Sequence, residues 1–254
     1  MSGQLENRIV LVTGAARGLG KAFALACADA GAQTIIVADI LETEGKACAS
    51  ELVAAGHDAH FLPLDLGEPA SCEKLAAEIE ARFGRLDSVI NNAAIATGIG
   101  GKMFDEIDID TWDRVMRVNV RGTWLVIRAL APLLRKSALG GRIVNLASDT
   151  ALWGAPRLLH YVASKGAIIS MTRSLARELG TDRICVNAIA PGLVRVEATE
   201  YVPRERHELY ETGRALPGAQ HPDDVNGAAI FLMSTAAGFV TGQVLPVNGG
   251  FVFN

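Results

Sequence analysis

Tyr161 and Lys165 stand four positions apart and have the chemistry to move a proton together. Residues at this spacing share one face of a helix, so a helix here would place the phenol beside the ammonium group. A free tyrosine has a pKa near ~10, which is too high for a base at neutral pH. An ammonium group at ~4 Å, with an effective dielectric constant of ~20, favours the phenolate by roughly 4 kcal/mol. The pair therefore predicts a tyrosine whose pKa is lowered toward neutrality, where general acid/base catalysis is efficient.

Two further polar residues could assist such a proton transfer. Ser148 follows an apolar strand-like run, and its hydroxyl can hydrogen-bond a substrate oxygen. Asn119 is a poor helix former inside an otherwise apolar helix-like stretch, which indicates a side-chain hydrogen-bonding role. Each alone is more typical of an ordinary strand end or a helix irregularity. Together with Tyr161 and Lys165 they predict a catalytic set.

A glycine-rich turn joins the first strand-like run to the first helix-like segment. Its glycines, Gly14, Gly18 and Gly20, follow the spacing Gly-x3-Gly-x-Gly. Glycine permits a positive φ, a close approach of the backbone to a pyrophosphate, and tight packing of the helix on the strand. The free N–H groups and the dipole of the helix N-terminus favour phosphate. The turn predicts a dinucleotide site, and a merely tight strand–helix turn is the alternative.

Asp39 ends the second strand-like run, at the distance after the glycine turn that is typical of an acidic residue binding ribose. A carboxylate there can accept hydrogen bonds from both adenine-ribose hydroxyls and would repel the 2′-phosphate of NADP. Arg17 argues the other way, because a guanidinium in this turn could bind that phosphate. Asp39 carries more weight, so NAD(H) is predicted to be preferred over NADP(H).

Apolar strand-like runs alternate with longer helix-like segments along the whole chain. The expected strands are 8–13, 34–39, 60–64, 88–91, 142–146, 184–188 and 243–247. The expected helices are 19–30, 42–55, 69–83, 111–135, 160–179 and 223–233. Continuous apolar strands separated by helices predict a parallel sheet covered on both faces. Right-handed crossovers make it a doubly wound, Rossmann-type α/β fold of about seven strands, in a single domain over 1–254.

Polar residues also follow the third and fourth expected strands. Asp65 and Leu66 are expected at the adenine edge, and Asn91, Asn92 and Ala93 at the adenosine side of the cleft. Such residues are ordinary in turns. Their value is that open α/β sheets bind ligands at the carboxyl ends of strands, where all of them fall.

Composition excludes several classes of function. The net charge is −4 and charged residues make up 20% of the chain, so a broad basic surface for nucleic acid is not expected. The longest apolar region, 123–134, contains Arg128 and Pro132 and is too short to span a bilayer. The histidines have no metal-binding spacing, and the scattered cysteines are typical of reduced thiols in a cytoplasmic protein.

The chain resembles the short-chain dehydrogenase/reductase family, of the single-domain kind. The matching residues run in family order: Thr13, Gly14, Gly18, Leu19, Gly20, Asn91, Asn92, Ala93, Asn119, Ser148, Tyr161, Lys165, Pro191 and Gly192. The resemblance implies that Tyr161 donates and accepts the proton and that Ser148 orients the substrate oxygen. It implies that Lys165 holds the nicotinamide ribose and lowers the pKa of Tyr161. Asn119 would fix a water that links Lys165 to solvent.

The residues and the resemblance together define three expected sets. The catalytic set is Asn119, Ser148, Tyr161 and Lys165. The cofactor-binding set is Gly14, Arg17, Gly18, Leu19, Gly20, Asp39, Ile40, Asp65, Leu66, Asn92, Ala93, Tyr161, Lys165, Pro191, Gly192 and Val194. The substrate-binding set is Ser148, Thr150, Trp153, Tyr161 and Leu193, and no metal is expected.

Two positions depart from the family pattern. The family often has Gly where Ala94 stands, which is a small change. It often has Thr where Val196 stands, which removes one side-chain contact to the cofactor. Thr199 could replace that contact if the loop shifts.

The polar and aromatic stretch at about 190–216 is expected to be a substrate lid that excludes water. The resemblance implies a homotetramer or homodimer, with the helices near 114–134 and 162–179 packing across an interface. The apolar end, 251–253, is expected to dock on a neighbouring subunit.

The leading interpretation is an NAD(H)-dependent oxidoreductase that acts on a secondary alcohol or ketone, of medium size and cyclic, aromatic or aliphatic. A 3-oxoacyl-thioester (ACP/CoA) reductase is the alternative enzyme, although its biosynthetic form usually requires NADPH. A non-catalytic dinucleotide-binding sensor or scaffold is an alternative of another class. It would have no need of Ser148, Tyr161 and Lys165, and a methyltransferase would have no use for the last two.

Overall fold

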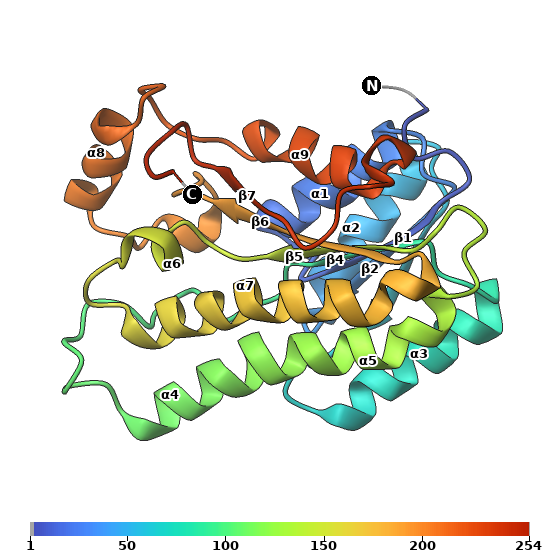
Figure 1. Ribbon diagram of the computed structural model, residues 1–254, viewed down its shortest axis with the longest axis horizontal. Coiled ribbons are helices and arrows are strands. Elements are labelled where there is room, and N and C mark those ends of the chain that lie inside the picture. Colours follow the sequence, from blue (N-terminus) through green and yellow to red (C-terminus); the bar gives the residue numbers. More distant parts are fainter. Residues whose placement is uncertain (1–2, 254) are drawn as a thin grey trace.

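Seven parallel strands form one sheet through the middle of the computed structural model, which describes residues 3–253 (Figure 1). The strands are β1 (Ile9–Thr13), β2 (Thr34–Asp39), β3 (Ala59–Pro63), β4 (Ser88–Asn91), β5 (Arg142–Leu146), β6 (Cys185–Pro191) and β7 (Val244–Val247). Their order in the sheet is β3-β2-β1-β4-β5-β6-β7. The direction of winding reverses between β1 and β4, and a ligand crevice is expected at such a reversal.

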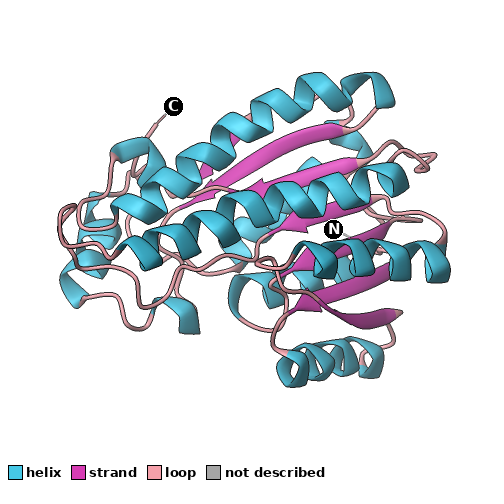
Figure 2. Cartoon of the chain, turned by 90° about the horizontal axis from the view of Figure 1, so that it is seen from below, coloured by secondary structure: helices cyan, strands magenta, loops and turns pink. Residues whose placement is uncertain are grey.

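Helices cover both faces of the sheet, as the continuous apolar strands predicted (Figures 1 and 2). One face carries α1 (Gly18–Asp29), α2 (Glu42–Ala54) and α9 (Asp223–Met233). The other carries α3 (Pro69–Phe83), α5 (Thr123–Leu134) and α7 (Leu159–Leu179). Every residue of β1, β2, β4, β5 and β6 is buried. The sheet therefore lies between two apolar layers, and the predicted doubly wound α/β fold is confirmed.

Each apolar layer has its own set of large buried side chains. Phe23 and Leu52 pack between the sheet and the layer of α1, α2 and α9. Leu75 and Leu130 do the same in the layer of α3, α5 and α7. The rigid sheet between the layers holds the carboxyl ends of its strands in fixed positions, where loops can present side chains to a ligand.

The helix expected over 111–135 is divided into three parts. It consists of α4 (Ile109–Val115), a π-helical segment (Met116–Gly122) and α5. Gly122 lies so close to Leu66 that a Cβ there would be 2.7 Å from the Leu66 Cβ. Apolar periodicity does not report such a widened turn, which is frequent at functional sites.

The region expected as a lid contains more regular secondary structure than the sequence predicted, and its role as a lid stays a prediction. The sixth strand extends to Pro191, so the first two residues of the expected lid belong to the sheet. A helix that was not predicted, α8 (Arg204–Gly213), lies inside the remaining segment, and a one-turn helix, α6 (Thr150–Trp153), follows β5. Figure 1 shows α6 and α8 near the same end of the sheet as the C-terminus. None of the described helices is long and apolar enough to cross a bilayer.

Candidate active site

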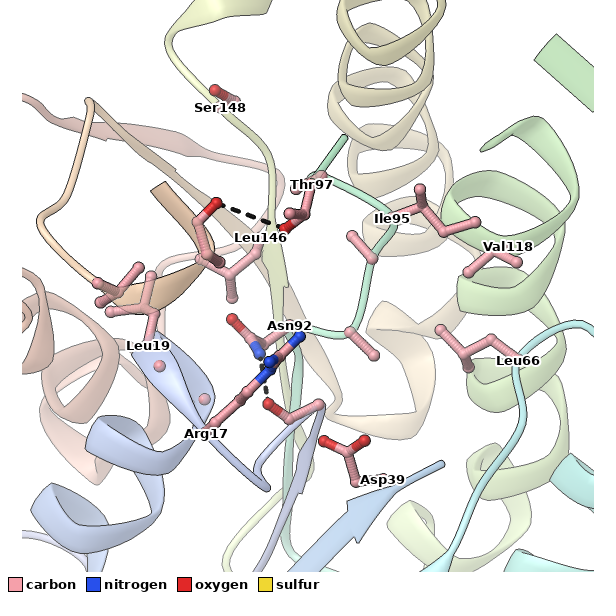
Figure 3. A pocket seen from close by; sticks show the side chains of 18 of the residues that line it. Arg17, Leu19, Asp39, Leu66, Asn92, Ile95, Thr97, Val118, Leu146 and Ser148 are labelled. Carbon is pink, nitrogen blue, oxygen red and sulfur yellow. Dashed lines mark hydrogen bonds between the residues drawn. The ribbon is translucent and has the colours of Figure 1, made fainter. Parts of the chain in front are cut away.

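A cleft of about 500 Å³ lies at the carboxyl ends of the central strands, on both sides of the reversal between β1 and β4 (Figure 3). Every residue expected to bind the cofactor lines it, from Gly14 in the first turn to Val194 after β6. Several other lining residues were not predicted from the sequence: Ala38, Leu41, Leu64, Val118, Leu146, Ala147 and Ala198. Most of these lie at or beside predicted strand ends, and that position is the signal that could have identified them.

The glycine turn is built for close contact. Gly14 has a φ of 67°, and a Cβ there would be 2.8 Å from the Ala93 Cα. A Cβ on Gly20 would be 2.0 Å from the Gly14 carbonyl oxygen. The Asn92 side chain donates hydrogen bonds of 3.1 Å to the carbonyl oxygens of Thr13 and Gly14. Asn92, which follows β4, therefore stabilises the turn through these two hydrogen bonds. The first residues of α1, Gly18 to Gly20, line the cleft.

Asp39 ends β2 with its carboxylate facing the cleft (Figure 3). Its Oδ2 accepts a hydrogen bond of 2.9 Å from the Ala16 backbone, and its Oδ1 accepts one of 3.0 Å from the Leu41 backbone. These two bonds hold the carboxylate in place. Each oxygen keeps a second lone pair with which to accept a further hydrogen bond.

Tyr161, Ser148 and Lys165 all line the cleft, as the sequence analysis expected. Burial raises the pKa of Tyr161 above its ordinary value, and a hydrogen bond from Ser148 opposes this rise. Burial also lowers the pKa of Lys165 to about 8. Both groups are therefore shifted toward their neutral forms by loss of hydration.

The expected lowering of the Tyr161 pKa by Lys165 is not found in this structure. The Lys165 Nζ donates a hydrogen bond of 2.6 Å to the Leu146 carbonyl oxygen. It lies over the Tyr161 ring, 5.6 Å from the ring centroid, rather than in a hydrogen bond to the phenol oxygen. The helical spacing does put the two side chains on one face. Burial disfavours the charged form of each, so neither the phenolate nor the ammonium form is stabilised enough to lower the Tyr161 pKa.

Ser148 is oriented by the residue two positions after it. Its Oγ accepts hydrogen bonds from the Thr150 hydroxyl at 2.9 Å and from the Thr150 backbone N–H at 3.3 Å. Both lone pairs of Ser148 Oγ are then occupied, so its own proton is free for donation. The serine hydroxyl is thereby fixed as a hydrogen-bond donor toward Tyr161 and the cleft.

Asn119 lies behind the cleft, in the π-helical segment. Its Oδ1 accepts a hydrogen bond of 2.7 Å from the Ile95 backbone, and its Nδ2 donates to the Ile95 carbonyl at 3.0 Å. The same amide donates to the Ser164 hydroxyl at 3.2 Å. The side chain therefore ties the loop after β4 to α7, between Tyr161 and Lys165. The water expected beside Asn119 stays a prediction.

Three residues of the expected substrate set do not line this cleft, and their contact with a substrate stays a prediction. Thr150 is buried against Ser148, and Trp153 donates a 3.1 Å hydrogen bond to the Tyr210 hydroxyl. The Leu193 carbonyl accepts a hydrogen bond from Arg214. A helical turn begins at Thr150, and successive side chains then rotate around the helix axis instead of continuing toward the cleft. Ser148 and Tyr161 remain at the cleft.

Thr199, which was considered as a replacement for the family's usual Thr, does line the cleft. Its hydroxyl donates a hydrogen bond of 2.7 Å to the Val194 carbonyl and accepts one of 3.1 Å from the Val196 backbone. Among residues 3–253, no group of three or more His, Cys, Asp and Glu residues is placed to hold a metal ion.

Comparison with known proteins places nearly the whole chain among dehydrogenases and reductases. A family model described as enoyl-(acyl carrier protein) reductase matches residues 14–252. The chain is 35% identical to the (2S)-[(R)-hydroxy(phenyl)methyl]succinyl-CoA dehydrogenase subunit BbsD of Thauera aromatica, over 97% of each chain. It is 35% identical to the 3-alpha-(or 20-beta)-hydroxysteroid dehydrogenase of Mycobacterium bovis, over 99% of this chain and 92% of that protein. The cyclopentanol dehydrogenase of Comamonas sp. is also 35% identical, over 99% and 100%.

Solved structures share the fold over nearly the full length. A short-chain type dehydrogenase/reductase from Mycobacterium marinum superposes with a TM-score of 0.91 at 28% identity, over 99% of this chain and 98% of the other. A gluconate 5-dehydrogenase from Burkholderia cenocepacia, solved with NADP and tartrate, superposes with a TM-score of 0.90 at 31% identity, over 98% and 96%.

Proposed function

Because the chain belongs to the short-chain dehydrogenase/reductase family of oxidoreductases, we propose that it transfers a hydride reversibly between NAD(H) and a secondary alcohol or ketone. The observation that carries this proposal is one cleft that brings Ser148, Tyr161 and Lys165 together with a glycine turn and Asp39. A non-catalytic dinucleotide sensor would need the glycine turn and Asp39 but not the first three side chains.

The residues of the cleft fit a nicotinamide dinucleotide. The close approach of Gly14 and Gly20 to their neighbours leaves the backbone N–H groups at the start of α1 open to a pyrophosphate. The free lone pairs of Asp39 suit the two hydroxyls of an adenine ribose. Leu66 and Asp65 would border the adenine end, and Pro191, Gly192 and Val194 would border the end near Tyr161. When bound, the cofactor supplies the hydride acceptor or donor at C4 of its nicotinamide ring.

The side chains of the cleft then handle the proton. In alcohol oxidation the phenolate of Tyr161 accepts the hydroxyl proton while the carbinol hydrogen leaves as hydride, which gives a ketone and a neutral tyrosine. Ser148, held as a donor by Thr150, stabilises the substrate oxygen as charge develops on it. Lys165, which its hydrogen bond to the Leu146 carbonyl holds over the Tyr161 ring, would bind the ribose at the nicotinamide end of the cofactor. In ketone reduction the same proton returns from Tyr161 to the oxygen.

Replacing Thr150 with valine is expected to lower kcat without weakening NADH binding. Valine keeps the shape of the side chain but removes the 2.9 Å hydrogen bond to Ser148. The loss of one neutral hydrogen bond at the reacting oxygen corresponds to roughly a tenfold fall in kcat. Steady-state rates and fluorescence titration with NADH measure the two quantities. A Thr150→Ser variant retains the hydroxyl and should retain most of the rate, and wild-type kcat in Thr150→Val would exclude this role.

The relatives support a medium-sized cyclic or aromatic hydroxyl compound as substrate. They include a cyclopentanol dehydrogenase, a hydroxysteroid dehydrogenase and a dehydrogenase of a phenyl-bearing acyl-CoA alcohol. Apolar side chains such as Ile95, Ala96 and Val196 line the cleft and suit such a ring. The test is a panel of cyclic, aromatic and linear secondary alcohols with NAD, followed by NADH absorbance. No turnover of any member would defeat the proposed function.

A 3-oxoacyl-thioester reductase is the second candidate, because the family model carries the description of an acyl carrier protein reductase and one relative is named for a CoA thioester. Acetoacetyl-CoA with NADH and with NADPH separates this activity from the first. Efficient reduction of the thioester, with weak activity on free alcohols, would favour this second candidate.

We also propose that the chain assembles as a homotetramer through the layer of α5 and α7, with a homodimer as the smaller alternative. Large apolar side chains are exposed along this layer, among them Trp124 on α5 and Leu159 at the start of α7, each 44% exposed. Figure 1 places α4, α5 and α7 side by side on one face of the molecule. Light scattering is expected to give about four times the monomer mass, and a monomer would contradict the proposal.

The C-terminal segment 251–253 was expected to dock on a neighbouring subunit. The Phe251 ring already stacks on the Tyr210 ring of its own chain, so it does not require a neighbouring subunit to cover it.

A further inference from the structure

Directly after Ser148 stands a carboxylate that is completely buried and has no part in the mechanism above. Asp149 is 0% exposed, and its Oδ1 accepts a hydrogen bond of 2.9 Å from the Tyr210 hydroxyl. That hydroxyl in turn accepts the hydrogen bond from Trp153 Nε1. Tyr210 belongs to α8, whereas Asp149 and Trp153 belong to the segment that follows β5. A chain of hydrogen bonds thus joins α8 to the residue beside Ser148.

Tyr210 is the principal buried anchor of α8. It is 2% exposed, and His207 is the other buried residue of this helix. Its ring stacks on Phe251 with centroids 4.3 Å apart, and the Arg214 guanidinium lies 5.5 Å from the same ring. Loss of the Tyr210 hydroxyl would leave this packing in place and remove only the polar link.

A third segment reaches the same carboxylate. Asn248, which follows β7, lies close enough to Asp149 to lower the pKa of its carboxyl group, and the Asn248 side-chain amide donates a hydrogen bond to the Val252 carbonyl at 3.2 Å. The C-terminal segment is therefore tied to Asp149 as well as to the Tyr210 ring. Burial raises the pKa of Asp149 to about 7, and the Tyr210 hydrogen bond works most strongly against that rise, with further contributions from Asn248, Arg214 and the Thr150 backbone. The Tyr210 hydroxyl is therefore the main stabilising partner of the carboxylate.

We propose that Asp149 is a positioning residue that couples closure of the α8 lid to the orientation of Ser148. The lid is the segment 192–216, and the C-terminal segment 248–252 closes with it. Asp149 is covalently between Ser148 and Thr150, so a shift of its side chain disturbs the hydrogen bonds that orient the serine hydroxyl. This proposal rests on the proposed function where it is tested by enzyme kinetics. Its second test, limited proteolysis of the segment 192–216, does not require that function.

The first test is Tyr210→Phe, which keeps the stacking on Phe251 and deletes the hydroxyl. A buried carboxylate that loses a donor favours the open lid and disturbs the orientation of Ser148, so KM for the alcohol should rise about tenfold and kcat should fall about fivefold. Limited proteolysis with NADH present should cut within 192–216 about tenfold faster than in the wild type. NADH affinity should stay within about twofold, because Tyr210 does not line the cleft.

Substitutions of Asp149, which accepts the hydrogen bond from Tyr210, give a rescue experiment. Asp149→Asn keeps an oxygen that can accept from Tyr210, so its KM should stay within about threefold of the wild type. Asp149→Ala should behave like Tyr210→Phe. The double variant Asp149→Ala/Tyr210→Phe should be no worse than either single variant, because both remove the same link.

Thr34→Val is the matched control. It deletes another hydroxyl that donates to a carboxylate, the 2.6 Å bond from Thr34 to Asp58, at the amino end of β2 and away from the cleft. KM and lid cleavage should be unchanged in this variant. Wild-type KM and cleavage in Tyr210→Phe, or equal changes in Thr34→Val, would overturn the proposal. If the wild type oxidised none of the alcohols, the proposed function would be rejected instead. The rates of proteolytic cleavage within 192–216 in the variants would still show whether the Tyr210 hydroxyl holds the lid closed.

Discussion

The Tyr161→Phe variant is expected to lose about three orders of magnitude in kcat while it binds NADH as the wild type does. The substitution removes the only atom that the proposed mechanism uses to accept and return the substrate proton. The ring stays, and with it the packing beneath Lys165. Steady-state rates with the best alcohol of the panel and fluorescence titration with NADH measure the two quantities.

The pH dependence provides an independent check on this residue. Burial raises the pKa of Tyr161, so alcohol oxidation, which needs the phenolate, should accelerate as pH rises. Ketone reduction, which needs the neutral phenol, should slow over the same range. Both dependences should disappear from whatever activity Tyr161→Phe retains. Near-normal turnover in this variant would remove Tyr161 from the mechanism.

The second large effect is expected from Asp39, which is proposed to set the preference for NAD(H). The wild type should use NAD at least about a hundredfold more efficiently than NADP, because the carboxylate accepts two hydrogen bonds from ribose and repels a 2′-phosphate. Asp39→Ala should lower kcat/KM with NAD by about two orders of magnitude and raise it with NADP. The ratio of the two kcat/KM values is the measurement.

Arg17 supplies the matched variant for this experiment. Its side chain also lines the cleft near Asp39, and Figure 3 shows both in one view. In an NAD enzyme Arg17→Ala should change kcat/KM with NAD by less than about threefold. A wild type that prefers NADP, and that loses this preference in Arg17→Ala, would overturn the Asp39 argument. The structurally similar gluconate 5-dehydrogenase was solved with NADP, so the preference of this chain between NAD and NADP has to be measured directly.

Asp39 also supports the fold locally, so the variant needs a stability control. Its carboxylate accepts from the backbones of Ala16 and Leu41, and alanine leaves both donors without that partner. Thermal unfolding of Asp39→Asn, which keeps one acceptor oxygen, separates a loss of cofactor binding from a loosened turn. A folded variant with altered cofactor ratio is the expected result.

The sequence by itself determined the fold class and most of the polar and glycine residues that line the cleft. Continuous apolar runs place each strand in a buried parallel sheet, and the carboxyl ends of such strands meet at one edge. Residues at those ends, such as Gly14, Asp39, Asn92 and Ser148, were therefore predictable as neighbours before any coordinates. The helical spacing likewise placed Tyr161 and Lys165 on one face.

Only the tertiary structure decided how those side chains are held. Asp149 and Tyr210 are 61 positions apart, and Asn119 meets Ile95 across 24 positions. Lys165 of α7 donates to a carbonyl on β5 rather than to the phenol beside it. Periodicity records which face of an element is buried, because burial follows the repeat of that element. It records nothing about which distant donor meets which acceptor, because that depends on how the packed elements bring their loops together.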